Sequence, residues 1–126
     1  DVYLADTLGE MGLWYRLAPV SFVGGSLVPV GGHNPFEPAA LGSAILHGPH
    51  VSNFLDIYAR LDGAAAAVLV QDATQLAEAL TGLLQPSKSA PMAYAAWELA
   101  SAGAAVTDKA LALILDHLPA AAGNDA

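Results

Sequence analysis

A glycine-rich stretch between a short apolar run and a helix-starting signal constrains the fold of this chain more than any other feature. The apolar run at residues 21–23 ends on Gly24 and Gly25, and two more glycines follow at Gly31 and Gly32. Glycine permits positive φ and a close approach of the backbone to a ligand. A short apolar run that stops at glycines is typical of a buried strand. The stretch therefore predicts a strand that ends in a binding loop.

The residues after this loop predict a helix. Asn34 is a good N-cap, Pro35 suits the first helical position, and Glu37 lies three residues after the cap, where it can complete a capping box. A helix that starts beyond the carboxyl end of a strand presents free N–H groups to an anion, as in the phosphate sites of open α/β sheets. The alternative is a surface loop that leads into a capped helix and binds nothing.

The same order of apolar run, loop and helical pattern continues along the chain. We expect strands at residues 2–5, 21–23, 44–46 and 65–70, and helices at 8–17, 35–41, 52–63, 72–85, 91–102 and 106–118. The last helix is expected to bury Val106, Ala110, Leu113 and Ile114. Continuously apolar strands between helices indicate an α/β class, with a Rossmann-like parallel sheet flanked by helices. Residues 1–118 are expected to form this domain and 119–126 a flexible tail.

Composition excludes several kinds of function. The 126 residues carry a net charge of −8 with four Lys and Arg in total, so the basic surface that nucleic acids require is missing. The chain has no cysteine, and His33, His47 and His50 fit no compact metal-ligand spacing, so we expect no metal and no cofactor. The phosphate-loop and dinucleotide fingerprints are also absent, as is the nucleophile elbow of serine hydrolases.

Two glutamates are placed alike. Glu10 and Glu37 each fall in the first turn of a helix that follows a strand, so both are expected to face the crevice at the carboxyl edge of the sheet. Carboxylates there can accept hydrogen bonds from sugar hydroxyls, although each alone could merely stabilise its helix dipole. Trp14, Tyr15 and Trp97 are expected to pack in the core, and Asp62 to lie on a solvated face.

Several motifs occur in an order that resembles the 3-deoxy-D-manno-octulosonic acid (Kdo) transferases. They are Asp6-Thr7-Leu8-Gly9-Glu10-Met11-Gly12, Phe22-Val23-Gly24-Gly25-Ser26-Leu27-Val28, Gly31-Gly32-His33-Asn34-Pro35-Phe36-Glu37-Pro38-Ala39-Ala40, Gly48-Pro49-His50 and Asn53-Phe54. The match covers about half of the chain, and His47 before the Gly-Pro-His turn is a minor departure. The resemblance implies the carboxyl-terminal, donor-binding half of a GT-B glycosyltransferase.

The family's activity then sets further expectations. Its members move Kdo from CMP-Kdo to a lipid A precursor in lipopolysaccharide synthesis, at the cytoplasmic face of the bacterial inner membrane, with which they associate peripherally. By similarity the CMP contacts fall on Leu8, Gly9 and Glu10 and on Asn34, Pro35, Phe36 and Glu37. The alternatives are another GT-B nucleotide-sugar enzyme or a noncatalytic α/β module that binds a nucleotide or a partner.

The chain opens at Asp1 without an initiator Met and directly in an apolar run, so we expect a piece of a longer protein. The family's catalytic base lies in the amino-terminal half and one nucleotide-binding Pro-Arg segment lies upstream of Asp1, so the chain alone is expected to be inactive. In the family's strand order, residues 2–5 would be the third strand and 21–23 the fourth. The two strands between them would be missing, so the sheet would have exposed strand edges. We expect a second copy of the chain, or a rearranged strand at residues 2–5, to pair with these edges.

Overall fold

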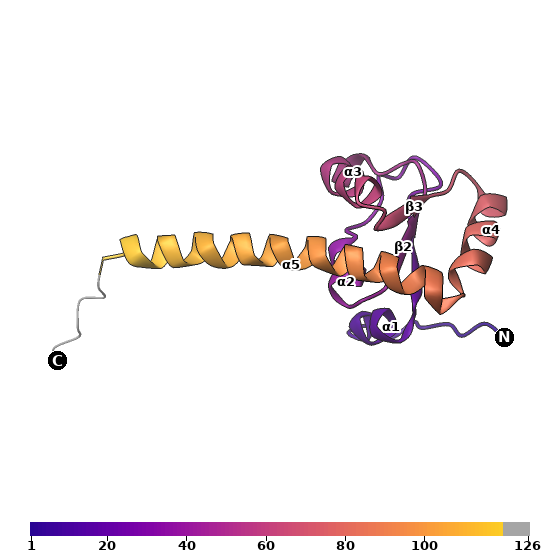
Figure 1. Cartoon of the computed structure of the whole chain (residues 1–126), viewed down its shortest axis with the longest axis horizontal. Coiled ribbons are helices and arrows are strands. Elements are labelled where there is room, and N and C mark those ends of the chain that lie inside the picture. The colour runs from indigo at the N-terminus through magenta and orange to yellow at the C-terminus, as the bar shows by residue number, and fades with distance from the viewer. Residues whose placement is uncertain (120–126) are drawn as a thin grey trace.

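The structure is a computed structural model that describes residues 1–119, in which three parallel strands form one sheet (Figure 1). The strands are β1 (Val20–Val23), β2 (Ala44–His47) and β3 (Ala67–Leu69), in the order β1-β2-β3. The register pairs Ser21 with Ile45 and Leu46 with Val68. All four residues of β2 are buried, as expected for a central strand of a covered parallel sheet. The predicted α/β class with a parallel sheet is confirmed.

One helix precedes β1, and helices follow each of the three strands. They are α1 (Met11–Leu17), α2 (Phe36–Ala40), the 3₁₀ turn η1 (Ser52–Phe54), α3 (Leu55–Gly63), α4 (Ala73–Leu83) and α5 (Pro86–His117). The core lies between the sheet and α2, α3 and α5, and its largest fully buried side chains include Ile45, Tyr58 and Leu61. Asp72 caps α4 as predicted, since its carboxylate accepts a hydrogen bond of 2.8 Å from the Gln75 amide.

The carboxyl end of the chain corrects the sequence prediction, because one helix replaces the two expected. Helix α5 continues through Pro91 and Gly103. Pro91 removes only one helical hydrogen bond near the amino end, and packing of Ser89, Ala96 and Ala100 holds the helix on both sides of it. No helix in the described part of the chain combines the length and apolarity needed to cross a membrane.

The expected burial at 106–118 is also wrong. The second half of α5 extends beyond the rest of the domain (Figure 1), and Val106, Leu113 and Ile114 are each more than half exposed. The expected core role of Trp97 is likewise not confirmed, because its side chain is 45% exposed beside Tyr94. The predicted tail lies outside the described residues from position 120 on.

The predicted strand at residues 2–5 does not form. This segment is irregular and Val2, Tyr3 and Leu4 are exposed, because no other strand in the described part of the chain pairs with it. Tyr3 instead rests on Trp14, with ring centroids 5.2 Å apart. Within residues 1–119, β1 therefore pairs only with β2 and has one open edge.

Candidate functional site

The glycine-rich loop is anchored by Ser26, which is fully buried. Its hydroxyl donates to the carbonyl oxygen of Val23 at 2.6 Å and accepts from the Gly48 amide at 2.9 Å. The Ser26 carbonyl oxygen also accepts a hydrogen bond of 2.9 Å from the His50 amide. These bonds join the loop after β1 to the turn after β2, so the two loops form one rigid rim at the carboxyl edge of the sheet.

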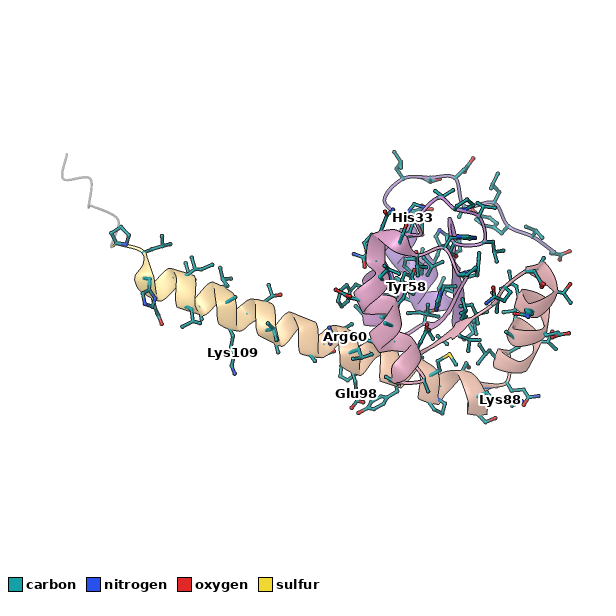
Figure 2. All side chains as sticks on the ribbon, turned by 90° about the horizontal axis from the view of Figure 1, so that it is seen from above. His33, Tyr58, Arg60, Lys88, Glu98 and Lys109 are labelled. Carbon is teal, nitrogen blue, oxygen red and sulfur yellow. The ribbon has the colours of Figure 1, made fainter. Side chains whose placement is uncertain are left out.

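The segment from Gly31 to His33 is held at three points. The carbonyl of Gly31 accepts from the Asn53 amide at 3.1 Å, and the amide of Gly32 donates to the Gly25 carbonyl at 2.9 Å. The carbonyl of His33 accepts a hydrogen bond of 2.7 Å from the hydroxyl of Tyr58 (Figure 2 shows both residues). Gly31 has a φ of 110°, and a side chain there would overlap Asn53, so this close packing requires glycine.

Asn34, Pro35, Phe36 and Glu37 form the start of α2. The side chain of Asn34 accepts a hydrogen bond of 2.9 Å from the Phe36 amide and so helps to cap the helix end, although the N-cap position itself falls on Pro35 and not on Asn34 as predicted. The assigned helix begins at Phe36 and not Pro35, a shift of one residue. The expected capping box does not form: among the hydrogen bonds of residues 1–119, none joins Glu37 to Asn34. The exposed carboxylate of Glu37 is therefore available to a ligand.

Leu8, Gly9 and Glu10 form the approach to α1, which begins at Met11 and not at Leu8 as predicted. Gly9 has a φ of 88°, a left-handed conformation that cannot continue a helix. Leu8 is 99% exposed. Glu10 lies at the N-cap position, where its side chain makes no capping hydrogen bond and its carbonyl accepts from the Leu13 amide at 3.0 Å.

A groove of about 470 Å³ lies near these two regions. It lies between α1 and β1, and its lining includes Met11, Trp14, Tyr15, Gly24 and His33. Met11 and Trp14 also line an adjoining hollow that reaches Leu8 and Gly9. The structure thus places Leu8 and Gly9 at one end of this depression and His33, the residue before Asn34, at the other. Neither Glu10 nor Glu37 is among the lining residues, so the expectation that both glutamates face one crevice stays a prediction.

Tyr15 is a titratable side chain in the lining of this groove. Burial raises the pKa of Tyr15 above its ordinary value, and the nearby carboxylate of Glu37 raises it further. The expected core role of Trp14 and Tyr15 is only partly met, because both are partly exposed. The indole N–H of Trp14 is buried without a hydrogen-bond partner among residues 1–119.

Proteins similar in sequence to this chain share one name. The chain is 44% identical over 107 residues to the 3-deoxy-D-manno-octulosonic acid transferase of Bordetella pertussis. This alignment covers 82% of this chain and 25% of that protein. The chain is 39% identical over 90 residues to the enzyme of the same name from Haemophilus influenzae, with 71% and 21% covered. This chain is homologous to part of the Kdo transferases. No protein-family model matches it.

A solved structure supports the same relationship. The C-terminal CMP-Kdo binding domain of WaaA from Acinetobacter baumannii superposes with a TM-score of 0.72 at 38% sequence identity, over 77% of this chain and 51% of that one. The chain thus spans about a quarter of the length of the Kdo transferases it matches and about half of the solved domain. The assignment of Leu8, Gly9, Glu10 and residues 34–37 to CMP stays a prediction.

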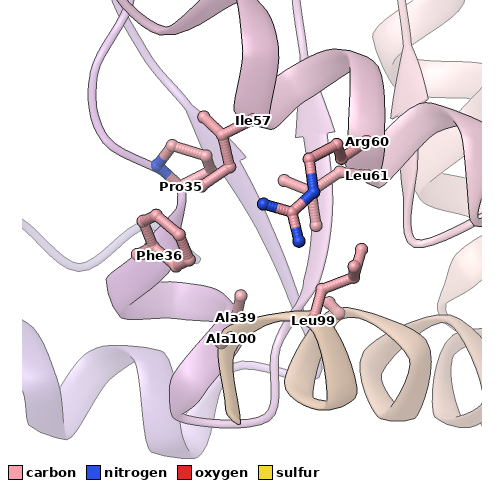
Figure 3. A pocket seen from close by; sticks show the side chains of 9 residues that line it. Pro35, Phe36, Ala39, Ile57, Arg60, Leu61, Leu99 and Ala100 are labelled. Atoms are coloured by element: carbon pink, nitrogen blue, oxygen red, sulfur yellow. The ribbon is translucent and has the colours of Figure 1, made fainter. Parts of the chain in front are cut away.

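Two of the residues predicted to contact CMP point their side chains away from the groove. Pro35 is buried and Phe36 half-exposed against α3 and α5, where they line a pocket of about 10 Å³ with Arg60 and Leu99 (Figure 3). The Phe36 ring also lies where a side chain at Gly103 would contact it. The side chains of Pro35 and Phe36 therefore pack inside the domain and do not line the groove.

The histidines serve the structure in ways that the sequence did not reveal. In residues 1–119, no group of three or more His, Asp or Glu side chains could hold a metal ion. His47 is buried, and its Nε2 lies 2.9 Å from Oδ1 of Asp62. Asp62 is exposed as expected, but the sequence did not indicate that its carboxylate also contacts a buried histidine. Tyr58 and Ser26 were also missed, because their importance depends on partners 25 and 22 residues away.

Proposed function

We propose that this chain binds the CMP portion of CMP-Kdo, as the donor-binding part of a Kdo transferase. The supporting observation is the 38% identity and common fold with a solved domain that is named for CMP-Kdo binding, over 77% of this chain. The groove between α1 and β1 is a candidate place for the nucleotide, because His33 next to Asn34 lines it and the adjoining hollow reaches Leu8 and Gly9.

The chemistry of the groove suits a nucleotide held mainly by backbone groups. The chain has a net charge of −8, and its four basic side chains form no cluster in the sequence. Amides of the glycine-rich loop and of the approach to α1 would then bind phosphate oxygens. The start of α2 adds little to this, because Pro35 has no N–H and the Phe36 amide already donates to Asn34. The exposed carboxylate of Glu37 would accept hydrogen bonds from the ribose hydroxyls.

The intact enzyme is proposed to be a GT-B glycosyltransferase that transfers Kdo to a lipid A precursor. An acceptor hydroxyl, activated by a carboxylate base, would attack the anomeric carbon of Kdo while CMP leaves. The base is expected in the amino-terminal half, so this 126-residue chain alone should not catalyse transfer. We propose that this transfer takes place at the cytoplasmic face of the inner membrane, with which the whole protein would associate peripherally.

Calorimetry with CMP, CDP, UMP and UDP tests the donor assignment. We expect CMP to bind more tightly than UMP, and Glu37→Gln to weaken CMP binding about 10-fold, since the ribose hydroxyls would then donate to a neutral amide oxygen in place of a charged carboxylate. The matched control is Glu78→Gln, which changes an exposed glutamate on α4. A preference for uridine nucleotides would instead favour another GT-B enzyme, and equal binding of all four would favour a noncatalytic nucleotide-binding module.

The open edge of β1 is proposed to pair with a second copy of this chain. Unpaired N–H and C=O groups on a strand edge favour pairing with another strand, and β1 pairs on one side only within residues 1–119. Light scattering should then report dimers of the isolated chain. A monomer at all accessible concentrations would contradict this proposal without affecting the donor assignment.

A further inference from the structure

Tyr58 connects the body of the domain to the segment that precedes α2. Its side chain is 1% exposed, and its hydroxyl donates a hydrogen bond of 2.7 Å to the carbonyl oxygen of His33. Burial raises the pKa of Tyr58 well above its ordinary value, with nearby Tyr15 and Asp62 adding to the effect, so the hydroxyl keeps its proton at neutral pH. The hydroxyl therefore remains a hydrogen-bond donor to His33 at neutral pH.

His47 supports the tyrosine ring from the side of the sheet. The two rings are 4.5 Å apart between centroids and tilted by 45°. The His47 ring is itself held at both nitrogens, with Nδ1 at 2.7 Å from the Gly48 carbonyl and Nε2 at 2.9 Å from the Asp62 carboxylate. The ring therefore has a polar partner on each of its two nitrogen edges. The ring has little freedom to turn, and neither does Tyr58 beside it.

The contact point on the loop is close to the residues predicted to bind the nucleotide. His33 lines the groove between α1 and β1, and the next residue, Asn34, caps α2 through its bond to the Phe36 amide. The His33 carbonyl is the last of the three points at which this segment is held, and the other two are at Gly31 and Gly32. If the Tyr58–His33 bond were lost, no other hydrogen bond within residues 1–119 would join His33 to the body of the domain.

We propose that Tyr58 is a positioning residue for the nucleotide site, and that the His47–Asp62 pair keeps it in place. This inference rests on the proposed binding of CMP. The tyrosine would not touch the nucleotide. It would hold the backbone of residues 33–37 in the binding geometry before the ligand arrives, so that less ordering is needed on binding.

The test compares two tyrosine variants in the full 126-residue chain. Tyr58→Phe keeps the ring against His47 and removes only the hydroxyl, whereas Tyr94→Phe removes an exposed hydroxyl on α5 and serves as the control. For Tyr58→Phe we expect CMP affinity by calorimetry to fall about five- to ten-fold, as for one lost hydrogen bond. Tyr94→Phe should bind like the unmodified chain.

Hydrogen exchange provides a second readout that does not require a ligand. The Phe36 amide, which donates to Asn34, should exchange faster in Tyr58→Phe, while amides of β2 should keep their protection. Asp62→Ala should produce a smaller change at Phe36 in the same direction. If Asp62→Ala leaves Phe36 unchanged, the role of the His47–Asp62 pair is overturned.

The outcomes separate a positioning role from a structural one. If Tyr58→Phe lowers the free energy of unfolding but the folded protein binds CMP as tightly as before, the positioning role is overturned. If the unmodified chain binds no CMP, the proposed function fails. The positioning of residues 33–37 is then decided by exchange at Phe36 alone, and unchanged exchange overturns it.

Discussion

Ser26 and Gly48 are in direct contact although 22 residues separate them. The Gly48 amide donates to the Ser26 hydroxyl at 2.9 Å, and a side chain at position 48 would overlap the Ser26 carbonyl. The two loops at the carboxyl edge of the sheet therefore approach as closely as two backbones can. Only glycine at 48 and a small hydrogen-bonding side chain at 26 satisfy both requirements.

Ser26→Ala should destabilise the fold by about 1–3 kcal/mol, because the buried amide of Gly48 loses its acceptor. Urea denaturation measures this change. Ser87→Ala, at an exposed position in the first turn of α5, is the control and should change stability by less than about 0.5 kcal/mol. Equal stabilities of the two variants would show that the Ser26 bonds contribute nothing.

Asp62→Ala should lower the free energy of unfolding by about 1 kcal/mol, because Nε2 of buried His47 loses its partner. Water replaces part of the loss, since Asp62 is 38% exposed. Asp62→Asn should retain most of the stability, because an amide offers either a donor or an acceptor to the ring. A greater loss for Asn than for Ala would contradict this account of the pair.

The domain should lose stability at alkaline pH in a way that depends on Tyr58. Its pKa is raised in the folded state, so as pH rises past about 10 the unfolded chain releases this proton first and unfolding becomes easier. Tyr58→Phe should reduce the slope of stability against pH by up to about 1.4 kcal/mol per pH unit. Part of the alkaline slope should remain in Tyr58→Phe, because the pKa of Tyr15 is raised in the folded state as well.

Urea denaturation from about pH 8 to about pH 11 follows this slope. The control is Tyr3→Phe, which removes a hydroxyl from an exposed residue and should leave the slope unchanged. An identical alkaline slope in the unmodified chain and in Tyr58→Phe would rule out ionisation of Tyr58 as its source.

Leu113→Ala should change the free energy of unfolding by less than about 0.5 kcal/mol, because Leu113 is 62% exposed on the projecting half of α5. Ala96→Leu, at a fully buried position in the packed half of the same helix, should instead cost about 1–3 kcal/mol through overpacking. Urea denaturation compares the two. A loss above about 1 kcal/mol for Leu113→Ala would mean that another surface covers this half in solution.

Local chemistry determined much of this protein from its sequence alone. Glycines after apolar runs, the Asn34 cap and the Asp72 cap predicted the strand, loop and helix units, since each signal acts within a few residues. The same motifs predicted the relationship to Kdo transferases and the two segments beside the groove. Local signals failed at Pro91, where packing along α5 outweighs one missing hydrogen bond, and at residues 2–5, where a strand needs a neighbour.

Only the tertiary structure decided which residues support that groove. Nothing near Tyr58 in the sequence indicates that its hydroxyl reaches His33, and nothing near His47 indicates that Asp62 holds its ring. The glycine-rich loop, read from the sequence as a flexible binding loop, is in fact held rigidly by Ser26, Asn53 and Tyr58. The physical reason is that a hydrogen bond between distant segments depends on how the chain folds back on itself, which no short stretch of residues specifies.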